Sequence, residues 1–289
     1  MTDQTPPSYP PQEEQSTPTA INPLALVPLE LGKAISVCFD FTIKNFMLLF
    51  SIFAIVVIPL NLLAYAIIGD IASFTAKMQK IQFDLLQNMG NKVQLQPIMQ
   101  QYAAIQAMSG KILLWSLLAG IFVMLATLAV QQGIIWITEK KTVNLLETYK
   151  KVAPKLLPYL IMSILFSIIF VLALMLFIIP GIYLALGWGF YSWVYLTEDK
   201  AFFDAFTRSK EIASGKRLTI LGYYIVFGLL FGIMQAILGS ILSLLPVVPV
   251  LSTLLVAVVS YGFQLFSIVF SAILFFSLKA RKEQSGQQS

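Results

Sequence analysis

The sequence has no histidine, a single cysteine and few charged residues, since Lys, Arg, Asp and Glu make up only 11% of its 289 residues. With Cys38 alone, the chain can form neither an intrachain disulfide nor a Cys/His metal site. Without histidine, it also lacks the side chain that most often acts as acid or base near neutral pH. These absences predict a protein that is not an enzyme and that carries no cofactor and no metal.

The chain is rich in apolar residues, which make up 58% of it, and its mean hydropathy is +0.81. Soluble domains carry about 25% charged residues, so this composition indicates an integral membrane protein. The net charge of +5 comes from Lys and Arg that stand beside apolar segments rather than along a polar face. We therefore expect membrane lipids, and not nucleic acid, as the surroundings of these basic residues.

Six segments are long and apolar enough, or nearly so, to cross a bilayer core of about 30 Å as helices of roughly 20 residues. They are residues 45–69, 111–138, 157–179, 181–197, 217–244 and 250–278. Pro180-Gly181 and the stretch from Pro246 to Pro249 interrupt apolar runs, which predicts tight turns. The expected fold is all-α: a polytopic membrane protein with six transmembrane helices in three hairpins, forming one domain over residues 23–279.

The basic residues between these segments predict the orientation of the chain in the membrane. Clusters of Lys and Arg precede the first segment, separate the second from the third and the fourth from the fifth, and follow the sixth. The positive-inside rule places all of these clusters in the cytoplasm. Both termini, including a short tail at residues 280–289, are then expected to be cytoplasmic.

The first 22 residues are rich in Pro, Gln, Ser and Thr, which predicts a disordered, Pro-rich cytoplasmic tail. They lack the basic start and the short apolar core of a secretory signal. The first membrane helix is therefore expected to remain in the mature chain.

Residues 70–110 are too polar to enter lipid, yet their apolar residues recur at spacings of three and four. These residues are Ile71, Phe74, Met78, Ile81 and Leu85 in the first half, and Ile98, Tyr102 and Ile105 in the second. With Asn88 to Asn91 as a turn, the pattern predicts an external antiparallel helical hairpin. A ligand could use the same stripe, but mutual packing of the two helices explains it without one.

Residues 200–214 combine charge with an apolar arc. Phe202 and Phe206 lie on one side of a helix, while Asp204 and Arg208 lie on the other and are spaced to form a surface ion pair. This is the pattern of an amphipathic helix at a membrane interface. We therefore predict cytoplasmic interfacial helices here and, from a weaker copy of the pattern, at residues 142–151.

The acidic residues of the same region allow a second interpretation. Glu198, Asp199, Asp204 and Glu211 could form an acid/base cluster. Water and basic neighbours would hold these carboxylates ionised, however, and no nucleophile accompanies them. The interfacial helix explains the segment better.

Ionisable residues are missing from the centres of the predicted membrane helices, which argues against a proton relay. The polar residues left there are Asn61, Gln131, Gln132, Gln235 and Gln264. Asn61, Gln235 and Gln264 could line a pathway for a polar molecule or a lipid headgroup. An amide in a helix bundle more often forms a hydrogen bond with a neighbouring helix, and this is the reading we prefer.

Small residues recur at every fourth position of the fifth segment, at Gly228, Gly232 and Ala236. Such a stripe allows a second helix to approach closely. That helix could belong to the same chain, to a second copy or to a protein partner.

A family resemblance rests on Asp199-Lys200 and Arg208-Ser209, preceded by the sequence Ile179-Pro180-Gly181-Ile182 and a short apolar helix. Over about residues 33–282 the chain resembles the YciC-like family of uncharacterised bacterial inner-membrane proteins. It also looks like the membrane domain attached to some glycerophosphodiester phosphodiesterases. The resemblance implies the bacterial plasma (inner) membrane as the location. It implies no activity, because the YciC-like family has no established one and because this chain lacks the histidines of the soluble phosphodiesterase barrel.

Two classes of function follow. The first is a non-catalytic membrane protein that supports envelope or membrane organisation through lipid or protein contacts. The second is a permease for a lipid-like or amphipathic small molecule. A cavity that brings Asn61, Gln235 and Gln264 together would favour the second class.

Overall fold

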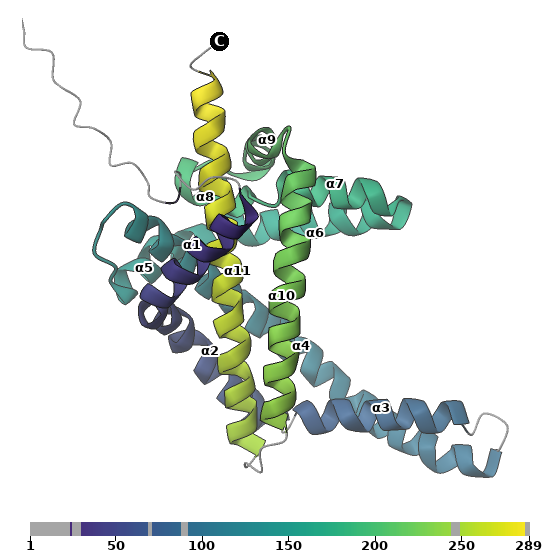
Figure 1. The fold of residues 1–289 in the computed structure, drawn as a ribbon. Coiled ribbons are helices and arrows are strands. Elements are labelled where there is room, and N and C mark those ends of the chain that lie inside the picture. Colours follow the sequence, from purple (N-terminus) through teal and green to yellow (C-terminus); the bar gives the residue numbers. More distant parts are fainter. Residues whose placement is uncertain (1–23, 25–29, 69–70, 88–91, 244–248, 287–289) are drawn as a thin grey trace, which may run out of the picture.

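The computed structural model describes residues 24, 30–68, 71–87, 92–243 and 249–286, and in these ranges the secondary structure is entirely helical. The helices, labelled in Figure 1, are α1 (Leu31–Lys44), α2 (Phe46–Ile68), α3 (Ile71–Gln87), α4 (Lys92–Thr138), α5 (Leu145–Val152), η1 (Ala153–Lys155), α6 (Leu156–Leu176), α7 (Ile178–Trp188), α8 (Tyr191–Glu198), α9 (Phe202–Ala213), α10 (Arg217–Ser243) and α11 (Pro249–Gly286). The all-α prediction is confirmed. The predicted tail at residues 1–22 lies outside the described residues.

Helices α10 and α11 form an antiparallel pair that stands at the centre of the molecule (Figure 1). α2 packs against both α4 and α11, and α1 packs across α11. α11 continues as helix beyond the predicted end at residue 279, as far as Gly286. The described core is therefore built around α11, the last helix in the sequence.

Five helical stretches in the described part of the chain are long and apolar enough to cross a membrane, rather than the six expected. They are Phe46–Ile67, Ser109–Thr138, Leu145–Leu176, Arg217–Leu242 and Leu254–Gln284. The missing one is residues 181–197, which form parts of two short helices, α7 and α8. At about 1.5 Å per residue, the 11 residues of α7 extend only about 16 Å.

The break between α7 and α8 falls at Gly189 and Phe190, where the helical hydrogen-bond ladder is interrupted. The backbone N–H of Phe190 donates instead to the Ser209 hydroxyl of α9, at 3.1 Å. After the break, Tyr191 to Leu196 are all buried among protein side chains. Hydropathy alone does not distinguish such a segment from a membrane helix, because a protein core and lipid select the same residues.

The two ends of the segment from α6 to α8 lie next to each other in the structure. Lys155, at the start of α6, forms an ion pair with Asp199, which follows α8. The Tyr195 hydroxyl also donates to the Lys155 carbonyl at 3.3 Å. Figure 1 shows α6 and α7 pointing away from α10 at a steep angle rather than running beside it. This arrangement is a hairpin that leaves the bundle and returns to the same end.

The turn of this hairpin lies at Phe177, earlier than the predicted Pro180-Gly181 break. Phe177 has an extended backbone between α6 and α7, while Pro180 sits in the first turn of α7, where its missing N–H costs little. Gly181 permits the close approach of the two helices, since a Cβ there would lie 2.6 Å from Leu174 Cδ2. At the tip, Phe177 and Ile179 are 70% and 81% exposed.

Both ends of the described chain meet at α11. The Ser277 hydroxyl donates to the Leu24 carbonyl at 3.1 Å, and the Cys38 thiol of α1 donates to the Phe266 carbonyl at 3.4 Å. Burial raises the pKa of the Cys38 thiol to about 12, which keeps it protonated and unreactive near neutral pH.

The expected pair of polar helices is present as α3 and the first part of α4, which pack together (Figure 1). Ile81 of the predicted stripe is buried. The Asn88 to Asn91 turn lies outside the described residues.

Candidate functional site

A group of charged residues joins α8, α9 and α11 around the carboxylate of Glu198. This carboxylate is 14% exposed and contacts Lys279 Nζ at 2.9 Å, Arg208 Nε at 3.1 Å and Lys200 Nζ at 3.2 Å. Arg208 also contacts Glu211 at 3.2 Å through Nη1. One acidic side chain therefore holds three basic ones from different parts of the sequence.

Two opposing effects act on the pKa of Glu198. Burial works to raise the pKa, but the hydrogen bonds and positive charges of Lys279, Lys200 and Arg208 outweigh it and hold the pKa below its usual range. An ionised carboxylate that is occupied by three cations is a poor proton donor. The geometry favours the structural reading of this acidic region over the acid/base reading.

The segment predicted as an interfacial helix forms helix α9, and its two phenylalanines differ in environment. Phe206 is 1% exposed, with ring centroids 4.8 Å from Trp188 and 5.2 Å from Tyr191, whereas Phe202 is 41% exposed. The apolar face of α9 packs on α7 and α8. Phe206 thus belongs to the protein core, while Phe202 lies at the surface of the protein.

The charged side of α9 also differs from the expected arrangement. The ion pairs of Arg208 are with Glu198 and Glu211, and Asp204 is exposed. Because Glu198 also binds Lys279, Arg208 fastens α9 to α8 and α11 rather than stabilising α9 alone. Because Glu198, Arg208 and Lys279 are not at helical spacings in the sequence, no local pattern predicts these ion pairs.

The three candidate polar positions within the membrane helices make separate contacts. Asn61 donates to the Val57 carbonyl of its own helix at 2.8 Å. Gln235 is exposed and lies 3.5 Å from the Ser260 hydroxyl of α11, and Gln264 is half-buried on α11. None of the three lines any of the cavities described below.

Two other amides of the sequence pattern, Gln131 and Gln132, are buried in α4. Gln131 donates to the Ser192 hydroxyl of α8 at 3.1 Å. This is the helix-to-helix contact expected of an amide in a bundle, and it fixes the buried helix α8 against α4.

The small-residue stripe of α10 faces outward. Gly228, Gly232 and Ala236 are exposed, and a Cβ added at either glycine would meet no atom within 4 Å. Self-association through this face stays a prediction.

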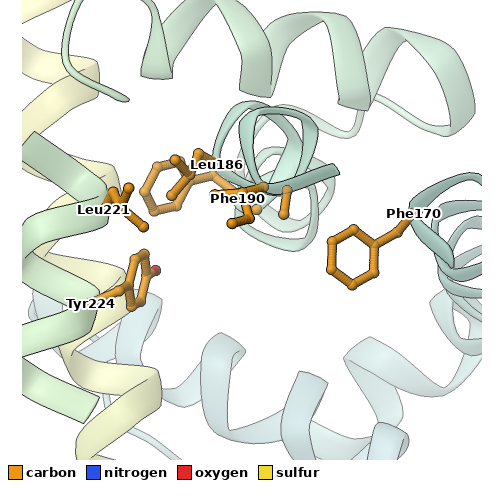
Figure 2. Close-up of a pocket in the computed structure, with 8 residues that line it drawn as sticks. Phe170, Leu186, Phe190, Leu221 and Tyr224 are labelled. Atoms are coloured by element: carbon orange, nitrogen blue, oxygen red, sulfur yellow. The ribbon is translucent and has the colours of Figure 1, made fainter. Parts of the chain in front are cut away.

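An apolar cavity of about 350 Å³ lies between the α6–α7 hairpin and α10. Figure 2 shows Phe170 of α6 on one side, Leu221 and Tyr224 of α10 on the other, and Leu186 and Phe190 between them. Ile182, Ala185 and Gly189 complete the lining. Its size falls in the range of ligand sites, about 300–1,000 Å³, and carbon dominates its walls. A smaller cavity, whose lining includes Phe50, Phe53 and Tyr261, has a volume of only about 10 Å³.

A third cavity, of about 140 Å³, lies on the opposite face of α7 and has a different chemistry. Its lining residues are Tyr183, Leu184, Gly187, Trp188, Lys210 and Arg217. In the sequence, Lys210 and Arg217 belong to the basic cluster between the fourth and fifth apolar segments. Their spacing carries no motif, and only the fold brings them to one cavity.

Among the residues with described positions, no three of His, Cys, Asp and Glu are grouped closely enough to hold a metal ion. The chain matches no family model, no curated protein and no solved structure. The resemblance to the YciC-like family therefore stays a prediction.

Proposed function

We infer that this protein is a non-catalytic, multi-pass protein of the bacterial inner membrane that supports membrane organisation by holding lipid. The apolar cavity between α6, α7 and α10 is the observation that carries this proposal. Lipid tails are as apolar as leucine, so hydrophobic burial gives them no reason to enter. They enter because the walls of an empty cavity forfeit dispersion contacts, which a flexible acyl chain restores.

The α6–α7 hairpin supports the same function. Its exposed tip, with Met175, Phe177 and Ile179, carries apolar side chains that water would disfavour. Because the hairpin leaves and returns at the Lys155–Asp199 ion pair, it enters one leaflet without adding a net crossing. The cavity beneath it then opens among lipid chains.

This arrangement also supports a common side for the two termini. If α2, α4, α10 and α11 each cross the membrane and the hairpin does not, the number of crossings is even. The contact between Leu24 and Ser277 agrees with that count. By the positive-inside rule this side is the cytoplasm. Reporter fusions at residues 142–155 and after Ser289 should report cytoplasm, and a fusion near Asn91 should report the outside; a cytoplasmic signal at Asn91 would refute this topology.

Transport of an amphipathic molecule is the alternative function. It requires a polar path, and Asn61, Gln235 and Gln264 would have to contribute to one cavity. Asn61 instead bonds its own helix, and Gln235 lies beside Ser260 of α11. These separate contacts do not support a shared polar path.

Lipid retention in mild detergent tests the proposal. Ala185 lines the cavity, so Ala185→Phe fills it, whereas Ala66→Phe adds the same ring at an exposed position of α2. Native mass spectrometry of the purified proteins should show lipid bound to the wild type and to Ala66→Phe, and less lipid bound to Ala185→Phe. Equal retention by all three proteins would show that the cavity holds no lipid.

A further inference from the structure

Arg217 is a cation without an anionic partner among the described residues. It begins α10, and its Nε and Nη1 atoms are buried without a hydrogen-bond partner in the described structure. The ion pairs formed by the described residues do not include it. Buried donors of this kind are rare in proteins, and each requires an explanation.

The aromatic contact of Arg217 satisfies only one part of the guanidinium. Its Cζ lies 3.9 Å from the centroid of the Tyr183 ring, as in a cation–π contact. The ring attracts the charge from above the guanidinium plane, while the N–H groups point outward within that plane. The contact orients the fork of donors without filling it.

Gly187 keeps space open beside this fork. A Cβ at this position would come within 3.4 Å of Arg217 Nη2, and both residues line the 140 Å³ cavity. Of the guanidinium nitrogens, Nη2 is therefore the nearest to the space beside Gly187.

A second basic residue, Lys210, lies at the same cavity because Ser209 fixes the position of α9. The buried Ser209 hydroxyl donates to the Gly187 carbonyl at 2.9 Å and accepts from the Phe190 N–H at 3.1 Å. These two bonds fix α9 on the end of α7 and place the next residue, Lys210, at the cavity. The neighbouring acid, Glu211, is turned to Arg208.

The described residues that line the cavity thus include two basic residues and no acidic one. A planar guanidinium fork is suited to the oxygens of a phosphate, and a lysine adds a point charge beside it. Arg217 is the first residue of Arg217–Leu242, a stretch long and apolar enough to cross a membrane. The first residue of a spanning helix lies at the depth of the lipid headgroups. The anion fixed at that depth is a lipid phosphate.

We propose that Arg217 and Lys210 bind the phosphate of an anionic phospholipid in the cavity between α7, α9 and the start of α10. The site lies across α7 from the apolar cavity, and it functions whether or not an acyl chain occupies that cavity. Headgroup selectivity, rather than lipid retention as such, is its signature.

The test compares binding of phosphatidylglycerol, phosphatidylcholine and inorganic phosphate to the full-length protein in an uncharged detergent, measured by native mass spectrometry titration. The wild type should bind phosphatidylglycerol more tightly than phosphatidylcholine, and inorganic phosphate should not compete at equal concentration. Arg217→Gln should weaken phosphatidylglycerol binding about 10- to 100-fold, as expected for a charge-assisted hydrogen bond. Lys210→Gln should weaken it less, because Lys210 is exposed.

Arg281→Gln is the matched control, since Arg281 is an exposed arginine near the end of α11. If it weakens binding as much as Arg217→Gln, or if neither Arg217→Gln nor Lys210→Gln has an effect, the site proposal is wrong. Equal competition by inorganic phosphate would assign the site to a free phosphate and overturn the lipid. Should Arg217→Gln fail to fold, Lys210→Gln and Arg217→Lys, which keeps the charge but loses the fork, decide the question. Loss of headgroup selectivity with lipid still retained would leave the function inferred from the larger cavity intact.

Discussion

Arg208 and Arg217 lie close together in the sequence and near the same end of the helix bundle, yet their surroundings differ. Arg208 is held by Glu198 and Glu211, and Glu198 also binds Lys279. Arg217 contacts the ring of Tyr183 and lines a cavity, and within the described part of the chain no carboxylate pairs with it. The first arginine completes a network within the chain. The second leaves a charge that an external anion can neutralise.

The comparison shows that a basic cluster beside a membrane helix can contain two kinds of basic residue: one that is paired with carboxylates of the chain and one that is not. Glu198 and Glu211 both form ion pairs with Arg208. Electrostatic stabilisation is therefore concentrated at the α8–α9–α11 junction. The start of α10 stays uncompensated.

The largest loss of stability is expected where both regions share a support. Phe206 packs against Trp188, which lines the Arg217 cavity, and it lies on the same helix as Arg208. Phe206→Ala should cost about 3–5 kcal/mol, because it leaves a cavity in a packed aromatic cluster. Thermal unfolding in detergent measures this loss. Phe202→Ala is the control and should cost far less; equal losses would mean that α9 is not packed as described.

The second prediction breaks only the paired region. Glu198→Gln removes the common partner of Lys200, Arg208 and Lys279, so it should lower the free energy of unfolding by about 3 kcal/mol. Asp204→Asn neutralises an exposed carboxylate and should change it by less than about 0.5 kcal/mol. The same unfolding measurement applies. If the two variants were equally stable, the Glu198 network would contribute nothing to the fold.

The third prediction uses pH to weaken the same region reversibly. The pKa of Glu198 is lowered in the folded protein, so its contribution is complete above the ordinary glutamate pKa of about 4.3 and is lost as the pH falls through the lowered value. The difference in unfolding temperature between the wild type and Glu198→Gln should therefore shrink as the pH is lowered from 7 towards 3. A difference that stayed constant over this range would rule out the lowered pKa.

The smallest effect is expected at the unpaired arginine. In detergent without added lipid, Arg217→Gln removes only the contact with Tyr183 and should change stability by less than about 1 kcal/mol. Arg208→Gln should be clearly more destabilising under the same conditions. The reverse order would indicate that Arg217 has a partner within the chain.

The sequence predicts the helical class and the five long apolar stretches, which contain α2, α4, α6, α10 and α11, because length and hydropathy decide these features directly. It does not separate α7 and α8 from a spanning helix, since the buried side chains from Tyr191 to Leu196 would suit lipid equally well. The environment of Phe206 was missed for the same reason.

The charged sites were less predictable than the helices. Lys279 reaches Glu198 from a distant part of the sequence, so no local spacing predicts this ion pair. The cavity at Arg217 likewise depends on Ser209 fixing α9 to α7. Local spacing indicated an Asp204–Arg208 pair, whereas tertiary contacts direct Arg208 to Glu198 and Glu211.

The most direct test of the account is the effect of phosphatidylglycerol on the unfolding temperatures of the wild type, Arg208→Gln and Arg217→Gln. A ligand that binds only the folded protein raises its stability in proportion to the logarithm of ligand concentration. We predict that added phosphatidylglycerol raises the unfolding temperatures of the wild type and of Arg208→Gln by similar amounts, and leaves that of Arg217→Gln almost unchanged. A shift of equal size in all three proteins would contradict the assignment of Arg217 as the arginine that binds an external anion.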